Sequence, residues 1–137
     1  ESFFSMRCDC RFQLTESLKQ IAQNGRGVIF YLQQEGRGIG LSNKIKAYSL
    51  QDKGLDTVEA NHQLGFKDDE RTYENIAGMV KYLAIKKLDL MTNNPKKIKA
   101  LEDMGIKVNQ RIPIFSDTNK YNEKYISTKK SKLGHLI

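Results

Sequence analysis

Two cysteines separated by one residue, in the stretch MRCDCRFQL, are the only cysteines in this chain of 137 residues. Thiolates bind Zn²⁺ well, and the arginines that flank Cys8 and Cys10 would favour the thiolate form. The alternatives are a pair of small core residues and a disulfide, although a disulfide across one residue would close a strained ring. A catalytic zinc also needs three protein ligands, and neither histidine of the chain lies at a spacing that indicates the third.

A glycine-rich stretch, QQEGRGIGLSNK, lies between an expected strand and an expected helix. The backbone amides around Gly36, Gly38 and Gly40 could hold a phosphate, although their spacing matches neither the dinucleotide fingerprint nor the P-loop. Glu35 could accept hydrogen bonds from the ring N–H and amino group of a base, while Arg37 could bind an anion. A tight turn with an exposed salt bridge explains the same residues.

Two further stretches combine acidic or basic side chains with an expected helix start. In FKDDERTY, Asp69 could act as an acid or base and Arg71 could bind an anion, but acidic residues also cap helices. In MTNNPKK, Thr92 ends a strand and Lys96 and Lys97 open a helix, where lysine opposes the helix dipole. A bound phosphate would remove that conflict, so this stretch is a second phosphate candidate.

The composition indicates one folded domain and favours an anionic binding partner. Lys and Arg number 23 against 16 Asp and Glu, which gives a net charge of +7 and favours phosphate, nucleotide or nucleic acid. Only two tyrosines interleave with the lysines of the basic tail, so a base-stacking platform is weakly supported and that tail is expected to be a solvated face. The apolar runs are too short for a membrane helix, so we expect a cytoplasmic protein.

The hydrophobic periodicity predicts an α/β domain over residues 1–137, a single domain in which helices flank a mixed sheet. Asn94 before Pro95 is a strong helix start, and either Asp56 or Thr57 could cap a short helix. Expected helices cover 14–24, 41–53, 56–65, 68–85, 94–105 and 122–137, and expected strands cover 27–34, 86–93 and 106–114.

Taken together, RCDC, QEGRGIGLSNKIKAYSLQDKGLDTVEANHQLGF, DDER, LMTNNPKK and TKKSKLGHL closely resemble GTP cyclohydrolase II across residues 1–137. The resemblance implies the first step of riboflavin biosynthesis, in which GTP loses C8 of its imidazole ring as formate and its β,γ-phosphates as pyrophosphate. The product would be 2,5-diamino-6-(5-phosphoribosylamino)pyrimidin-4(3H)-one. It also implies a homodimer that uses Zn²⁺, with Mg²⁺ on the triphosphate.

The same resemblance implies roles for individual residues. Cys8 and Cys10 would bind the zinc whose water attacks C8, and Tyr48 would donate a proton or orient the ring, unless it only packs a helix. Arg71 would attack the α-phosphate or, more conservatively for so firmly protonated a group, stabilise its charge, with Asp69 as proton acceptor. The positions that would hold GTP are Gln13, Glu35, Gly36, Arg37, Thr57, Thr92 and Lys97.

The chain departs from the family in two places. The family has an upstream segment with a third cysteine ligand, so residues 1–137 are expected to be an N-terminally incomplete domain. Arg11 stands where the family has glycine after the second cysteine, which would strain the turn if that glycine has a positive φ. Two other functions therefore stay open, namely an inactive nucleotide-binding fragment and a basic nucleic-acid-binding module.

Overall fold

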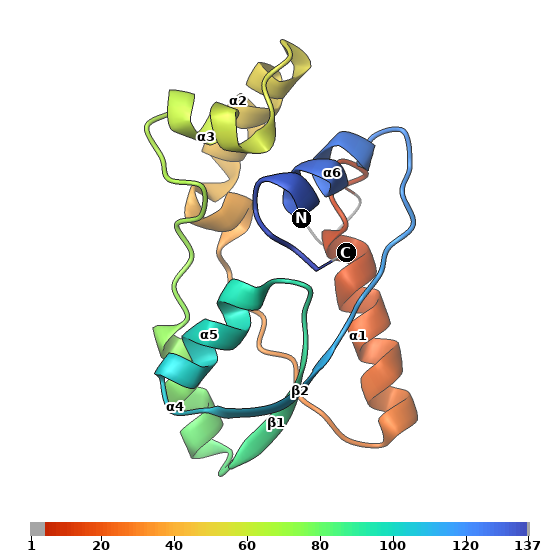
Figure 1. Ribbon diagram of the computed structural model, residues 1–137, viewed down its shortest axis with the longest axis vertical. Helices are drawn as coiled ribbons and strands as arrows, with labels where there is room; N and C mark the ends of the chain where they lie inside the picture. Colours follow the sequence, from red (N-terminus) through yellow and green to blue (C-terminus); the bar gives the residue numbers. More distant parts are fainter. Residues whose placement is uncertain (1–4, 137) are drawn as a thin grey trace.

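The computed structural model describes residues 5–136 and confirms the predicted α/β class. Six α-helices, one 3-10 helix and a pair of parallel strands make up this described part (Figure 1). In chain order the elements are α1 (Cys10–Asn24), η1 (Glu35–Gly38), α2 (Gly40–Asp52), α3 (Thr57–Gln63), α4 (Glu74–Tyr82), β1 (Lys87–Met91), α5 (Pro95–Asp103), β2 (Lys107–Ile112) and α6 (Glu123–Ser131).

The strand-helix-strand unit β1-α5-β2 carries the main hydrophobic cluster. β1 and β2 pair in parallel from Lys87 opposite Lys107 to Met91 opposite Ile112, with an irregularity after Leu88. Val80 of α4, Leu101 of α5 and Ile106 pack together beside this sheet, and the partly buried side chains around them include Phe30. The unit therefore places the loop that follows β1 at a fixed edge of the core.

The start of α5 confirms the prediction made for Asn94 and Pro95. The Asn94 side chain accepts a hydrogen bond from the Lys96 amide at 3.0 Å, and Pro95 occupies the first turn, where its missing N–H costs nothing. The short helix α3 is capped by Asp56 rather than Thr57, in a reciprocal capping box with Glu59. Both caps fix where site-bearing loops end.

The prediction of a strand over 27–34 is wrong, because this segment is irregular. Its apolar residues gave a strand-like pattern, but no residue of the segment is fully buried: the partly buried Phe30 packs on the core, while Val28 and Tyr31 are 46% and 56% exposed. β-propensity reflects packing and a neighbouring ladder, and within residues 5–136 no strand pairs with this segment.

The predicted helix over 68–85 is too long, because α4 begins only at Glu74. The preceding residues are held extended by the glycine loop: the Glu70 amide donates to the Arg37 carbonyl at 3.0 Å. The Gln34 side chain also bonds both the amide and the carbonyl of Thr72, at 3.0 and 2.8 Å. These tertiary hydrogen bonds replace helical ones and bring the acidic stretch against the loop.

The other helices differ from expectation mainly at their ends. α1 begins at Cys10, four residues before the expected start, and α6 ends at Ser131 instead of continuing to the last residue. Gly134, with φ +67, reverses the chain after α6. None of the helices in residues 5–136 is long and apolar enough to cross a bilayer.

Of the glycines in the loop, Gly38 should be the one that tolerates replacement by alanine least. A Cβ there would lie 3.0 Å from the Glu70 backbone, whereas one on Gly40 would meet nothing within 4 Å, although both have positive φ. We expect Gly38→Ala to lower the free energy of unfolding by about 2–4 kcal/mol and Gly40→Ala by about 1 kcal/mol, because only the first adds a clash to the backbone strain. Equal costs in denaturant unfolding would contradict the tight contact.

Candidate functional site

A small buried cavity of about 90 Å³ brings together residues that are far apart in the sequence. Its walls come from the start of α1, the glycine loop, the stretch before α4, the loop between β1 and α5, and the C-terminal segment. The predicted site residues on its walls are Cys10, Gln13, Arg37, Arg71, Thr92 and Lys97. The fold thus unites the separate phosphate candidates of the sequence at one place.

The cavity is strongly cationic, since Arg37, Arg71, Lys97 and Lys129 all line it. Burial, together with the charges of Arg71 and Lys129, lowers the pKa of Lys97 to about 8. Burial and the neighbouring cations, Lys129 first among them, lower the pKa of His135 to about 4. A bound anion would relieve this repulsion, so the electrostatics favour a phosphate-bearing ligand.

The surroundings of Arg37 indicate a missing hydrogen-bond acceptor. Among the described residues, its Nη1 atom is the buried side-chain donor that makes no hydrogen bond. The residue is 8% exposed, and its guanidinium carbon lies 5.7 Å from the centre of the Tyr125 ring. Its φ of +62 is a left-handed conformation that non-glycine residues adopt only under tertiary constraint. A buried donor without an acceptor is costly, which suggests a ligand oxygen at this position.

Asp69 and Arg71 form a two-point ion pair, with Nε to Oδ1 at 2.8 Å and Nη2 to Oδ2 at 2.5 Å. Burial alone would raise the pKa of Asp69, but the hydrogen bonds and charge of Arg71 lower it. Despite burial, the same hydrogen bonds raise the pKa of Arg71. Both groups are therefore charged near neutral pH, an arrangement that suits stabilisation of a negatively charged phosphate.

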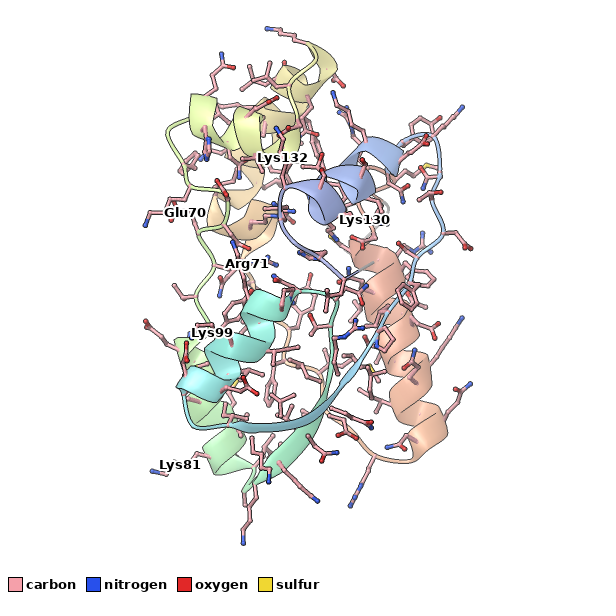
Figure 2. The ribbon with its side chains drawn as sticks, viewed as in Figure 1. Glu70, Arg71, Lys81, Lys99, Lys130 and Lys132 are labelled. Atoms are coloured by element: carbon pink, nitrogen blue, oxygen red, sulfur yellow. The ribbon has the colours of Figure 1, made fainter. Side chains whose placement is uncertain are left out.

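A larger, more open cavity of about 780 Å³ also has Arg71 on its wall. It shares Arg71 and Asn94 with the small cavity, and Asp69 lies on its wall. Figure 2 shows Arg71 in the middle of the molecule, between α5 and the pair formed by α2 and α3. The volume is within the range of small-molecule pockets, so the two cavities together could accommodate a nucleotide around Arg71.

Cys8 lies outside both cavities, near Tyr48 and Lys44 of α2. Cys8 is 7% exposed, and no disulfide joins it to Cys10. A hydrogen bond with the Cys10 side chain lowers its pKa to about 6 against the opposing effect of burial, and Lys44 contributes through its charge. Burial raises the pKa of Tyr48, whose ring lies under the cations of Arg7 and Lys44 at 4.7 and 5.5 Å.

Three of the predicted GTP-binding residues line neither cavity: Glu35, Gly36 and Thr57. One carboxylate oxygen of Glu35 accepts from Lys44 Nζ and from the Gly36 amide, both at 2.8 Å. Thr57 is the first residue of α3, directly after the Asp56 cap. Their roles in nucleotide binding stay predictions, and for Glu35 that role requires a change of partner from Lys44 to the base.

The thiolates of Cys8 and Cys10 have the right chemistry for zinc, but the described residues do not complete a catalytic zinc site. Such a site takes three protein ligands and leaves one position open. Within residues 5–136, no group of three or more His, Cys, Asp or Glu side chains is placed to hold a metal ion. His62 instead pairs with Asp68 at 2.5 Å, and His135 lines the small cavity.

Sequence reasoning missed the C-terminal contribution to the cavity, namely Tyr125, Lys129 and His135. The basic tail was expected to be a solvated face, yet Lys129 is 5% exposed. A signal was present, because Lys129 lies three residues after Ile126 and four before Leu133, and both of these are buried. That spacing places the lysine on the apolar face of its helix.

Comparisons with known proteins identify the family to which this chain belongs. The family model described as GTP cyclohydrolase II matches residues 1–113. A protein of Campylobacter hominis named GTP cyclohydrolase-2 is 61% identical over 133 residues, which are 97% of this chain and 67% of the relative. Proteins of the same name from Shewanella amazonensis and Haemophilus influenzae are 56% and 55% identical over the whole chain and 67% and 63% of their own lengths. The chain spans about two thirds of these relatives, and it belongs to the GTP cyclohydrolase II family of hydrolases.

Proposed function

We propose that this protein opens the imidazole ring of GTP, releasing formate and pyrophosphate and leaving 2,5-diamino-6-(5-phosphoribosylamino)pyrimidin-4(3H)-one for riboflavin biosynthesis. The chain belongs to the family, and the proposal extends to it the reaction that the resemblance implies, carried out by a cytoplasmic homodimer. The observation that carries it is the convergence of Arg37, Arg71 and Lys97 on one buried cavity, with a guanidinium nitrogen of Arg37 left without an acceptor. A triphosphate supplies the acceptors and the negative charge that this cluster lacks.

Each part of the cluster suits a different part of the triphosphate. Lys97 lies in the first turn of α5, where a phosphate would also meet the positive end of the helix dipole. Thr92 is 5% exposed, and its hydroxyl accepts from the Asn94 amide at 3.1 Å, so it can donate to a phosphate or ribose oxygen. Arg71, held by Asp69, can stabilise the negative charge that develops when pyrophosphate leaves.

The base end of GTP would lie toward α1 and the glycine loop. Gln13 lines the cavity and donates its side-chain amide to Asp9 at 2.7 Å. Glu35 would read the guanine N1–H and amino group once Lys44 is exchanged for the base, and Tyr48 would orient or protonate the ring. Cys8 and Cys10 stay the proposed ligands of zinc, and the triphosphate stays the proposed ligand of Mg²⁺.

The small cavity is smaller than a nucleotide requires, since ligand pockets measure about 300–1,000 Å³. GTP must therefore displace side chains there or extend into the larger cavity past Arg71. Arg71 lines both cavities and is held by Asp69, so GTP that spans the two cavities would lie against this ion pair.

The proposed reaction is tested by incubating the protein with GTP, Zn²⁺ and Mg²⁺ and measuring both products. We expect formate and pyrophosphate in equal amounts, because one turnover releases one of each. GTP binding without formate would instead support an inactive nucleotide-binding module. Binding of nucleic acid that weakens steeply with salt, with no response to GTP, would support the third function.

The variant Arg71→Lys separates the two roles of Arg71. If Arg71 stabilises charge, lysine should keep part of that effect and pyrophosphate release should fall by about 10- to 100-fold, as when one stabilising donor is weakened. If Arg71 forms a bond to the α-phosphate, release should be abolished and GTP binding retained. Single-turnover measurement of pyrophosphate, with binding measured on the same sample, distinguishes the outcomes.

Affinity for GTP should fall above pH 8 because Lys97 loses its proton there. The terminal phosphate is already ionised at pH 7.5, and only the charged lysine binds it well, so affinity should fall by about tenfold between pH 7.5 and 9. Lys97→Arg keeps its charge and should flatten this dependence. Lys99→Arg, on the outer side of α5 where Lys99 pairs with Asp103, should leave it intact (Figure 2). A wild-type affinity that is flat across this range in calorimetry would contradict the role of Lys97.

A further inference from the structure

The C-terminal segment, residues 119–136, connects parts of the site that are otherwise separate. Figure 1 shows α6 beside the N-terminal end of α1 and next to α3. All of this segment lies beyond the 1–113 match to the family model, and the motifs assigned to chemistry lie before it, apart from the closing TKKSKLGHL stretch. Its contacts nevertheless reach three of the stretches that carry the predicted site.

The first contact is a buried ion pair between Lys129 and Asp9. Lys129 Nζ lies 2.5 Å from Asp9 Oδ1, and the two side chains are only 6% and 4% exposed. The other carboxylate oxygen of Asp9 accepts from Gln13 Nε2 at 2.7 Å. Asp9 stands between Cys8 and Cys10 and is the residue that precedes α1, so the ammonium of Lys129 holds a carboxylate at the start of this helix.

The second contact reaches α3, and the third reaches the loop after β1. Lys132 pairs with Asp56 and with Glu59, the latter at 3.0 Å, and so engages both members of the capping box of α3. At the far end, the Leu136 amide donates to the Asn93 carbonyl at 2.8 Å, beside Thr92. The segment therefore joins the start of α1, the start of α3 and the loop that leads into α5.

We propose that residues 119–136 form a clamp that holds these three stretches in register, and that Lys129 is its central positioning residue. The inference takes the location of the site from the proposed function but concerns the assembly of the site rather than the reaction. A buried charge is tolerated only when it is paired, so Asp9 can occupy its position between the cysteines only while Lys129 is present. Lys129 lies on the Tyr125 ring at 4.7 Å, which keeps its long side chain directed inward.

Removing either charge alone should have a different effect from removing both. In Lys129→Met the buried carboxylate of Asp9 loses its counter-charge and must reach water, which would pull the start of α1 and Gln13 out of place. In the double variant Asp9→Asn, Lys129→Met no charge is left uncompensated, so the local packing can be retained. Lys129→Arg keeps the charge and should behave much as the wild type does.

The matched control is Lys130→Met, which makes the same chemical change one residue along the same helix at an exposed position (Figure 2). We expect amide hydrogen exchange over 9–13 and 123–136 to accelerate by about tenfold or more in Lys129→Met, because local opening exposes both ends of the broken pair. It should return to within about threefold of wild type in the double variant and in Lys129→Arg, and stay unchanged in Lys130→Met.

The outcomes separate this inference from the proposed function, because hydrogen exchange does not depend on turnover. Faster exchange confined to 123–136, with 9–13 unchanged, would overturn the clamp and leave the ion pair as a local feature of α6. If Lys129→Met fails to fold, the clamp is tested with Lys129→Arg and the double variant instead. A double variant in which residues 9–13 exchange as fast as an unfolded chain would also overturn the clamp. If the wild type releases no formate but the variants differ from it in hydrogen exchange as expected, the result contradicts the proposed function and leaves the clamp standing.

Discussion

The rest of the site depends on the crowding of like charges around one buried cavity. Arg37, Arg71, Lys97 and Lys129 line about 90 Å³ of space, and two carboxylates, Asp9 and Asp69, offset part of their charge. Burial strengthens electrostatic repulsion and removes the water that would relieve it. The lowered pKa values of Lys97 and His135 follow first from burial and then from that repulsion. A site with this charge excess is most stable when an anion occupies it.

Asp9, Asp69 and Arg71 lie outside the helices and strands, whereas Arg37, Lys97 and Lys129 lie in η1, α5 and α6. Short-range interactions fix the loops that carry or adjoin these groups. Gly36, Arg37 and Gly38 have positive φ in succession, which lets the chain turn tightly enough for Glu70 to bond the Arg37 carbonyl. The Asn94 cap fixes the start of α5, and with it Lys97. The parallel pair β1 and β2 gives the loop after β1 a rigid base. Binding residues on constrained loops of a packed scaffold are the common solution for ligand sites.

Where local chemistry decided the structure, it could be predicted from the sequence. The Asn94-Pro95 helix start, the helix over 40–52 and both strands of the parallel pair follow from capping, periodicity and turn residues. Where tertiary contacts decided, prediction failed: residues 27–34 lack a ladder among the described residues, and 69–72 are held by Gln34 and Arg37 instead of joining α4. The cavity itself joins stretches more than 100 residues apart, so its convergence could not follow from spacing alone. The burial of Lys129 did leave a signal, in its spacing from Ile126, but that spacing does not reveal Asp9 as its partner.

The central claim, that the cationic cavity binds the phosphate chain of the nucleotide, is tested most directly by comparing GTP with guanosine. Calorimetric titration of the protein at pH 7.5 with each compound isolates the phosphates, because the two share base and ribose. Since each charge-assisted hydrogen bond contributes about 1.5–3 kcal/mol, GTP should bind at least about 100-fold more tightly than guanosine. Equal affinities for GTP and guanosine would contradict the account, because the buried cations would then contribute nothing to recognition.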